Sequence, residues 1–342
     1  MIVTVMYPPR LPEGAVERLQ AAGATEVHHV PYFETQELRN ARQLGQLTDE
    51  LEATAPPVDD AGWANLLESE AVMALDLPVG LVERSERLAW VQAIGAGVGQ
   101  LGPARLGEAG IVLTNAAGVA SASIAEFVIG RVLEVIKNIR TLEVQQAEKR
   151  WEMCLGGLLK GRTMGIVGLG AIGRDTARRA RAFGVEVLAT RRSARPGDTD
   201  PDVDELWPAD ALDDILGRCD VVVLCAPSTA ETQRLFDAGR IARMKPGSIL
   251  VNVARGALVD EPALIGALEA GHLGAAVLDV QDNEPMSADD PLWDAPNLYL
   301  SPHSSTSTEG YDDALIDLFA LNIARRVGDE PMHNLVDTSI GY

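Results

Sequence analysis

The sequence predicts an α/β protein with two domains, each built around a parallel β-sheet. Short apolar runs alternate with helix-like segments along most of the chain, which is typical of parallel strands joined by helical crossovers. The chain has 342 residues, of which 46% are apolar, and this is enough to form two cores of ordinary size. A single domain of this length would be unusually large.

The N-terminal third contains four apolar runs that we interpret as buried strands. They are residues 2–6, 71–75, 88–94 and 111–114. The acidic stretch over residues 34–60 contains Pro56-Pro57 and is interpreted as helix and surface loop. Together these segments predict a small α/β layer.

A long helix is predicted to follow. Ser123-Ile124-Ala125-Glu126 has the capping-box pattern, and it stands at the head of an apolar-periodic segment that continues toward Gln146. We therefore expect one helix over about residues 121–146 with a broad apolar face. Such a helix would link two lobes, pack against another subunit, or belong to the core of one domain.

The second half of the chain predicts a doubly wound parallel sheet. The expected strands are residues 164–167, 185–189, 221–225, 249–253, 275–280 and 298–300. A helix over residues 262–270 should be capped by Asp260 and ended by Gly271. The last helix is expected over about residues 307–327.

The most informative motif is the turn Gly168-Leu169-Gly170-Ala171-Ile172-Gly173. An apolar strand enters it, and a helix-like segment over residues 174–183 leaves it. In that setting the backbone N–H groups and the helix N-terminus can hold a pyrophosphate, so a dinucleotide is the expected ligand. Gly97-Val98-Gly99-Gln100-Leu101-Gly102 has the same spacing, but Pro103 follows it directly, so we expect a glycine-rich loop there and no long helix.

The end of the second strand of this half predicts which dinucleotide binds. That position usually carries an acidic residue, which accepts a hydrogen bond from the ribose 2′-hydroxyl. Here the chain reads Thr190-Arg191-Arg192-Ser193, in which two guanidinium groups and two hydroxyls could hold a 2′-phosphate and no carboxylate repels it. NADP(H) is therefore expected in preference to NAD(H), with a solvated arginine turn as the alternative interpretation.

Composition restricts the partners and the compartment. The net charge of −21 disfavours nucleic acid and anionic membranes, so a small molecule is the expected partner. Cys154, Cys219 and Cys225 form no C-x-x-C pair, which favours a reducing compartment, and we expect a cytoplasmic protein without a metal site. No stretch approaches the ~20 apolar residues that span a bilayer, and the N-terminus carries no targeting pattern.

Three polar residues follow strands of the second half: Arg255, Glu284 and His303. Ligands of open α/β sheets bind beyond the carboxyl ends of the strands, so these side chains are candidates for the chemistry. Each alone would be unremarkable, because an Arg after a strand is usually a surface charge and a lone His is more often structural.

The chain resembles the D-isomer-specific 2-hydroxyacid dehydrogenases over nearly its whole length. The shared motifs are Gly95-Ala96-Gly97-Val98, Thr114-Asn115, Ala125-Glu126, Gly168 to Gly173, Asn252 to Gly256, Asp279-Val280, Glu284-Pro285, Pro291-Leu292-Trp293, Pro296-Asn297 and Pro302-His303. Their order and spacing make the resemblance specific. It implies an oxidoreductase with a Rossmann-like NAD(P)-binding domain.

By this resemblance Arg255, Glu284 and His303 are the catalytic residues. Arg255 would orient the substrate carboxylate and polarise the 2-oxo group, and His303, paired with Glu284, would exchange the proton. The backbone N–H groups of Ala96, Gly97 and Val98 would bind the substrate carboxylate. The resemblance assigns Ala254 and Asp279 to the nicotinamide carboxamide, and Cys225, Ala226, Pro227 and Thr232 to the adenosine side.

The chain departs from the family pattern at three positions. Gly99 stands after Val98 in place of the usual Asp, Gln281 replaces a usual aromatic or apolar residue, and Arg191 replaces the usual strand-end acid. The last difference changes the cofactor. The first two leave the rigidity of the substrate loop and the lining of the pocket open.

The resemblance also predicts how the chain is organised. A dinucleotide-binding domain, residues 117–303, would be inserted into a flavodoxin-like substrate domain made of residues 1–116 and 304–342, with the active site in the cleft. A homodimer is expected, and the helix over about residues 121–146 is a candidate interface.

The expected activity is NADPH-preferring reduction of a small 2-oxoacid, such as glyoxylate or hydroxypyruvate, to a D-2-hydroxyacid. An enzyme of the D-3-phosphoglycerate dehydrogenase type is an alternative, which the short segment after His303 disfavours because it leaves no room for an added regulatory domain. A second alternative is an interaction scaffold like the corepressors that share this fold, which would bind a peptide.

Overall fold

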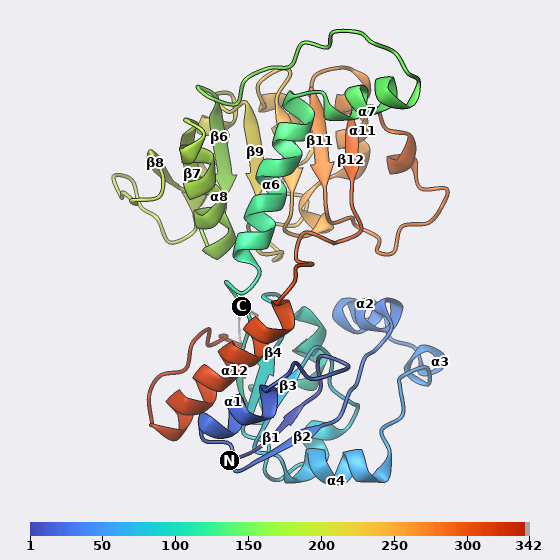
Figure 1. Ribbon diagram of the computed structural model, residues 1–342, viewed down its shortest axis with the longest axis vertical. Helices are drawn as coiled ribbons and strands as arrows, with labels where there is room; N and C mark the ends of the chain where they lie inside the picture. Colours follow the sequence, from blue (N-terminus) through green and yellow to red (C-terminus); the bar gives the residue numbers. More distant parts are fainter. Residues whose placement is uncertain (339–342) are drawn as a thin grey trace. The chain divides into compact units, whose positions relative to one another are not determined.

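The computed structural model describes residues 1–338, apart from the side chains of residues 43 and 44, and it divides into two compact units (Figure 1). The first unit comprises Met1–Val119 together with the segment from Thr308 onward, and the second comprises Ala120–Ser307. The second unit is thus inserted into the first along the chain. Each unit is an α/β domain with a parallel sheet, which confirms the predicted fold class.

The first unit contains a five-stranded sheet in the order β2-β1-β3-β4-β5, in which every neighbouring pair is parallel. This is the flavodoxin-like strand order. The strands are β1 (Ile2–Val5), β2 (Glu26–His29), β3 (Ala71–Ala74), β4 (Trp90–Ala93) and β5 (Val112–Thr114). Only β2 was not predicted, because this edge strand contains one glutamate and two histidines and is not fully buried.

Helices cover both faces of this first sheet. The helices α1 (Ala15–Ala21) and α12 (Tyr311–Val327) pack on one face, where Leu19 and Phe319 meet Trp90 in the core. The helices α4 (Asp60–Glu68) and α5 (Leu81–Arg84) pack on the other face through Leu66 and Leu81. The polar stretch expected as helix and loop contains α2 (Gln36–Leu44) and α3 (Asp49–Glu52).

The second unit contains a seven-stranded parallel sheet in the order β12-β11-β10-β9-β6-β7-β8. The strands are β6 (Thr163–Val167), β7 (Glu186–Arg191), β8 (Glu205–Pro208), β9 (Val221–Leu224), β10 (Ile249–Asn252), β11 (Ala275–Leu278) and β12 (Leu298–Leu300). The chain runs outward from β6 to β8 and then returns to β9 on the other side of β6. The topological switch point, where ligands bind in such sheets, therefore lies between β6 and β9.

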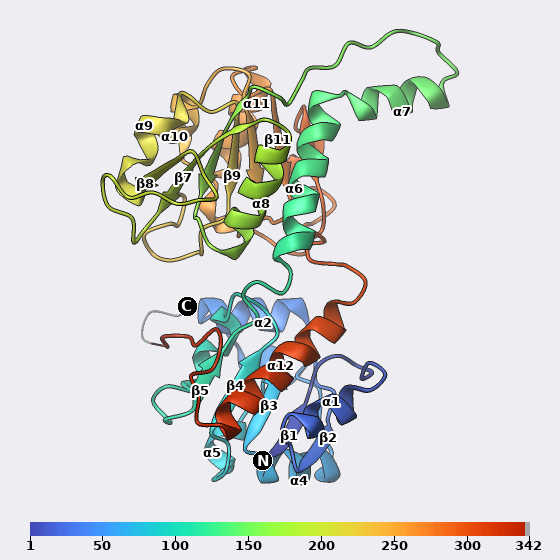
Figure 2. The same cartoon turned by 60° about the vertical axis from the view of Figure 1, so that its left-hand side comes forward.

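The second sheet is also covered on both faces, as Figure 2 shows. The helices α6 (Ser121–Ile136) and α8 (Ala171–Ala182) pack on one face. The helices α9 (Leu212–Leu216), α10 (Ala238–Arg243) and α11 (Glu261–Glu269) pack on the other. The predicted cap of α11 is confirmed, because the side chain of Asp260 accepts a hydrogen bond from Ala263 N and Gly271, at φ +67°, follows the helix end.

The prediction of one long helix over about residues 121–146 is wrong. The segment forms α6 and then α7 (Ile139–Ala147), because Asn138 adopts the left-handed conformation with φ of 54° between them. The capping box is also wrong: α6 begins at Ser121, and the Ser123 hydroxyl donates to the carbonyl oxygen of Ser305 at 2.8 Å. None of the helices in the described part of the chain is long and apolar enough to cross a membrane.

Candidate active site

The glycine turn at the switch point has the geometry that a pyrophosphate site needs. Gly168 has a φ of +100°, and a Cβ on it would lie 2.8 Å from the backbone nitrogen of Ala226. A Cβ on Gly173 would collide with the carbonyl oxygen of Gly168, whereas the space at Gly170 is open. Two of the glycines thus permit the tight turn, and the third leaves the first N–H groups of α8 accessible. These residues fit the phosphates of a dinucleotide.

The turn after β9 lies directly against this glycine turn. Cys225 N donates to the carbonyl oxygen of Val167 at 2.8 Å, which brings Cys225, Ala226 and Pro227 to the switch point. The Thr232 hydroxyl donates to the carbonyl oxygen of Pro227 at 2.7 Å and accepts from Thr229 N at 2.7 Å. In this structure Thr232 therefore closes the turn that follows the strand.

Arg191 ends β7, and the structure corrects one expectation about its surroundings. The sequence suggested that no carboxylate lies nearby, but Asp200 approaches, with Arg191 Nη1 3.3 Å from its Oδ2. Arg174 of α8 holds the same carboxylate with two contacts of 2.7 Å. The hydrogen bond from Arg174 lowers the pKa of Asp200 below its usual range, so the carboxylate is ionised. Arg174 also contacts Asp202 at 3.1 Å, so two carboxylates share the arginine side chains beside the end of β7.

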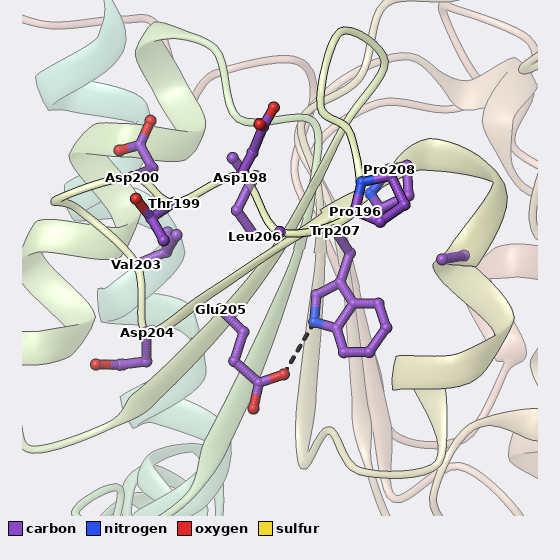
Figure 3. Close-up of a pocket in the computed structure, with 12 residues that line it drawn as sticks. Pro196, Asp198, Thr199, Asp200, Val203, Asp204, Glu205, Leu206, Trp207 and Pro208 are labelled. Carbon is purple, nitrogen blue, oxygen red and sulfur yellow. Dashed lines mark hydrogen bonds between the residues drawn. The ribbon is translucent and has the colours of Figure 1, made fainter.

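Asp200 also contributes to a cavity of about 430 Å³ that the sequence did not predict (Figure 3). The cavity lies between β8 and the loop that precedes it. Its lining residues are Pro196, Gly197, Asp198, Thr199, Asp200, Val203, Asp204, Glu205, Leu206, Trp207, Pro208 and Ala211. The indole N–H of Trp207 donates to Glu205 at 2.9 Å inside it. None of the predicted site residues lines this cavity.

The three candidate catalytic residues follow three neighbouring strands. Arg255 comes after β10, Glu284 after β11 and His303 after β12, so their loops leave the same edge of the sheet. The structure brings two of them into contact, with Nδ1 of His303 2.9 Å from Oε2 of Glu284. Arg255 Nη1 donates to the carbonyl oxygen of the preceding residue, Ala254, at 2.6 Å.

The charges of the three side chains influence one another. Burial alone would raise the pKa of Glu284, but the hydrogen bond and charge of His303, with Gln281 N and the more distant Arg255, hold that pKa below its usual range. Burial lowers the pKa of the Arg255 guanidinium, and the negative charge of Glu284 acts against this. Glu284 is therefore a carboxylate at neutral pH, placed to support a positive charge on the imidazole.

Asn252 fixes the turn that carries Arg255. Its Nδ2 donates to the carbonyl oxygen of Arg255 at 2.8 Å, and its Oδ1 accepts from Ala254 N at 3.0 Å. Asn252 is fully buried, so both contacts replace water that the amide has lost. The turn then continues into the 3₁₀ helix η3 (Gly256–Leu258).

Asp279 fixes the segment that carries His303. The segment holds His303 at a φ of 51°, which is uncommon for a residue other than glycine. The buried carboxylate of Asp279 accepts from Ser301 Oγ at 2.6 Å, Ser304 N at 2.9 Å and Ser305 N at 3.0 Å, and its carbonyl oxygen accepts from His303 N at 2.8 Å. Sequence reasoning missed this role, and the serines on both sides of His303 were the available signal.

The candidate substrate loop belongs to the first unit, where it follows β4. Ala96 offers its carbonyl oxygen to Asn115 Nδ2 at 2.9 Å, and Gln100 Nε2 donates to the carbonyl oxygen of Leu75 at 3.2 Å. After Val98 the chain forms only the 3₁₀ helix η1 (Gly99–Ala104), as expected for a loop without a long helix. Side-chain hydrogen bonds thus fix this loop although Gly99 replaces the usual Asp.

Comparison with known families identifies the chain. The model described as "D-isomer specific 2-hydroxyacid dehydrogenase, NAD binding domain" matches residues 129–305. The chain belongs to this family. Its members are NAD(P)-dependent oxidoreductases, so the predicted enzyme class and the nicotinamide cofactor are confirmed at that level.

Similar curated proteins include glyoxylate reductases, D-3-phosphoglycerate dehydrogenases and an (S)-sulfolactate dehydrogenase. A glyoxylate reductase of Thermofilum pendens is 30% identical over 303 residues, which are 83% of this chain and 86% of the relative. A D-3-phosphoglycerate dehydrogenase of Methanocaldococcus jannaschii is 34% identical over 266 residues, which are 75% of this chain. The match spans only 49% of that dehydrogenase, about half of its length.

Solved structures of similar proteins share the whole architecture. A D-isomer-specific 2-hydroxyacid dehydrogenase of Xanthobacter autotrophicus Py2, in complex with NADPH and MES, superimposes with a TM-score of 0.78 at 27% identity, covering 99% of both chains. An NADPH-dependent glyoxylate/hydroxypyruvate reductase of Sinorhizobium meliloti, in complex with NADP and sulfate, gives 0.75 at 26% identity, again covering 99% of both chains.

Proposed function

We propose that this protein is an NADPH-preferring reductase that converts small 2-oxoacids, of the glyoxylate and hydroxypyruvate kind, to D-2-hydroxyacids. The 2.9 Å contact between Glu284 and His303 carries the proposal. A carbonyl can be reduced to an alcohol only if a proton reaches its oxygen, and an imidazole backed by a carboxylate supplies that proton near neutral pH.

His303 is the proposed acid and base. Glu284 occupies Nδ1, so Nε2 is the ring nitrogen that gives a proton to the forming alkoxide, and the carboxylate stabilises the imidazolium before transfer. In the oxidative direction the same nitrogen accepts the proton of the hydroxyl. The nicotinamide cofactor, when bound, supplies the hydride.

Arg255 is the proposed orienting group. Its guanidinium presents a planar set of donors to the substrate carboxylate and the 2-oxo oxygen, which aligns the substrate and polarises the carbonyl. The backbone N–H groups of Ala96, Gly97 and Val98 are proposed to bind the substrate carboxylate as well. Ala254 and Asp279 are proposed to contact the carboxamide of the cofactor.

Arg191 and Arg192, with Thr190 and Ser193, are proposed to select NADPH. The guanidinium of Arg191 at the end of β7 supports this assignment, because a 2′-phosphate carries up to two negative charges and a 2′-hydroxyl carries none. The NADPH and NADP in the two solved structures of similar proteins agree with it. Gly168, Gly170, Ala171, Ile172 and Gly173 would hold the pyrophosphate, and Cys225, Ala226, Pro227 and Thr232 would border the adenosine.

The proposed assembly is a homodimer that forms through α7 and the segment after it. This part of the second unit extends away from its sheet (Figure 2). It exposes large apolar side chains: Trp151 is fully exposed, Met153 is 90% exposed and Leu155 is 84% exposed. A second copy of the chain would cover them.

The three cysteines are free thiols, which supports the cytoplasm as the proposed compartment.

Initial rates test the activity. NADPH oxidation should be measured with glyoxylate, hydroxypyruvate, pyruvate and phenylpyruvate, with His303→Ala as the inactive control. Because two relatives are named D-3-phosphoglycerate dehydrogenase, oxidation of D-3-phosphoglycerate should be measured alongside, and preference for it would replace the substrate proposed here. Peptide binding without any turnover would favour the scaffold alternative.

A further inference from the structure

Gln281 lies where the three loops of the candidate site meet. It follows β11, it is only 7% exposed, and its side-chain Nε2 donates to the carbonyl oxygens of Leu278 and Ser301, each at 3.2 Å. The amide therefore joins the end of β11 to the segment that follows β12. The mechanism above gives this buried polar side chain no part.

The backbone of Gln281 holds Glu284 directly. Gln281 N donates to Oε1 of Glu284 at 2.9 Å, while Oε2 contacts His303 at 2.9 Å. The two oxygens of one carboxylate are thus bound to two different loops. Glu284 cannot rotate away from His303 without losing the contact with Gln281.

Gln281 also contacts the other two loops. The carbonyl oxygen of Ser301 accepts hydrogen bonds both from Gln281 Nε2 at 3.2 Å and from His303 N at 3.1 Å. On the opposite side, a Cβ on Gly256 would overlap the peptide of Gln281, so the turn that carries Arg255 packs directly on this residue. Gln281 therefore contacts the loops that carry Arg255, Glu284 and His303.

We propose that Gln281 is a positioning residue that keeps Glu284 in register with His303 and thereby sets the pH range over which the proton is exchanged. The inference rests on the proposed role of His303. An apolar side chain of the same size would leave the carbonyl oxygens of Leu278 and Ser301 without their side-chain donor in a buried place. The two loops would then relax, and proton exchange tolerates little misplacement.

The test compares Gln281→Met with Gln92→Met in the full-length protein. Both changes replace a buried, hydrogen-bonded glutamine with a thioether of similar size. Gln92 lies in β4 of the first unit, where it contacts Ala93, Thr114 and Asn322, so its variant reports the general effect of losing core hydrogen bonds. The readouts are kcat and KM between about pH 5 and 9, NADPH affinity by fluorescence titration, and Tm.

For Gln281→Met we expect kcat to fall by about 10- to 100-fold while the NADPH dissociation constant stays within about twofold. The basic limb of the pH profile should move to lower pH, because the imidazolium loses part of its carboxylate partner. For Gln92→Met we expect a lower Tm with an unchanged pH profile. A Gln281→Met enzyme with the kcat and pH profile of the original protein would overturn the inference, and so would a loss of kcat without any movement of the profile.

Two further variants cover the remaining outcomes. If Gln281→Met fails to fold, Gln281→Glu is used in its place. The carboxyl group of the new side chain can donate a hydrogen bond to a carbonyl oxygen only when it is protonated. The kcat of this variant relative to the original protein should therefore rise as the pH falls, and a constant ratio would overturn the inference. His303→Ala separates the two proposals. Turnover that survives this change refutes the proposed mechanism, whereas turnover lost in His303→Ala but normal in Gln281→Met refutes only the positioning role.

Discussion

Replacing Glu284 by glutamine tests the acid–base assignment, because the change keeps the shape of the side chain and removes its charge. Nδ1 of His303 is 2.9 Å from Glu284, and the side chains are 40% and 20% exposed, respectively. The hydrogen bond and charge of His303 help to hold the pKa of Glu284 below its usual range, so the carboxylate and the imidazole interact favourably when both are charged. Solvent screens this pair because the imidazole is partly exposed, so we take about 1 kcal/mol, the upper end for an exposed ion pair.

The expected result is a fall of about fivefold in kcat/KM for 2-oxoacid reduction, which is the rate equivalent of about 1 kcal/mol. The fall should be larger at higher pH, because the imidazolium that donates the proton has lost its charged partner. The assay is initial-rate NADPH oxidation at saturating NADPH across the pH range, with His303→Ala as the reference without the imidazole.

Glu261→Gln is the matched control for this prediction. Glu261 is the first residue of α11, and its Oε1 accepts from Asp282 N at 2.8 Å. It is therefore a partly buried carboxylate that contacts the loop carrying Glu284 but does not pair with His303. Its removal should leave the pH profile unchanged. If Glu284→Gln also keeps the original profile and rate, the carboxylate of Glu284 does not support the proton transfer.

Four further outcomes follow from the structure. Arg191→Ala should raise KM for NADPH by roughly 10- to 100-fold, because it removes one charge-assisted hydrogen bond, and should leave KM for NADH within about twofold. Equal effects on both cofactors would show that Arg191 does not contact the 2′-phosphate. Joint replacement of Trp151 and Leu155 by serine should halve the mass in light scattering at micromolar concentration if the exposed segment forms the dimer; an unchanged dimer would place the interface elsewhere. Asp260→Ala removes the cap of α11 and should cost about 1 kcal/mol, or about 2–4 °C in Tm for a unit of this size, whereas an unchanged Tm would show that the cap contributes nothing. The pKa of Glu284 in the folded protein is held below its usual 4.5, so ionised Glu284 stabilises the fold above pH 4.5 and this contribution is lost as the pH falls through the lowered pKa. The Tm difference between the original protein and Glu284→Gln should therefore shrink on acidification, and a constant difference would contradict this direction.

The interior strands could be predicted from the sequence because they are continuous apolar runs. Both edge strands that were missed carry polar residues: β2 includes Glu26 and His28, and β8 includes Glu205 and ends at Pro208. An edge strand is partly exposed to solvent, so some of its side chains can be polar and it need not be a continuous apolar run. These two strands are held by their pairing with β1 and β7, which a local pattern cannot show.

The break between α6 and α7 could not be predicted from periodicity. Apolar residues continue on both sides of Asn138, and the interruption depends on that one residue taking a left-handed conformation. Asparagine tolerates this conformation better than most residues, but it also occurs inside helices, so an asparagine in the sequence does not by itself predict a helix break.

Candidate site residues could be predicted where chemistry restricts the residue type. The glycine turn and the pair Glu284–His303 are of this kind, since few residues can replace them. Asp200 was missed because its contact with Arg191 depends on the path of the loop before β8. Gln281 was noted only as a departure from the family pattern, and its hydrogen bonds to two loops became visible only in three dimensions.

We propose that this chain reduces small 2-oxoacids with NADPH by means of His303, Glu284 and Arg255. The most direct measurement is the initial rate of NADPH and, separately, NADH oxidation with glyoxylate, hydroxypyruvate, pyruvate and phenylpyruvate, in the original protein and in His303→Ala. We expect turnover that favours NADPH and disappears in the variant. No turnover with any of these acids, or turnover that persists without His303, would contradict it.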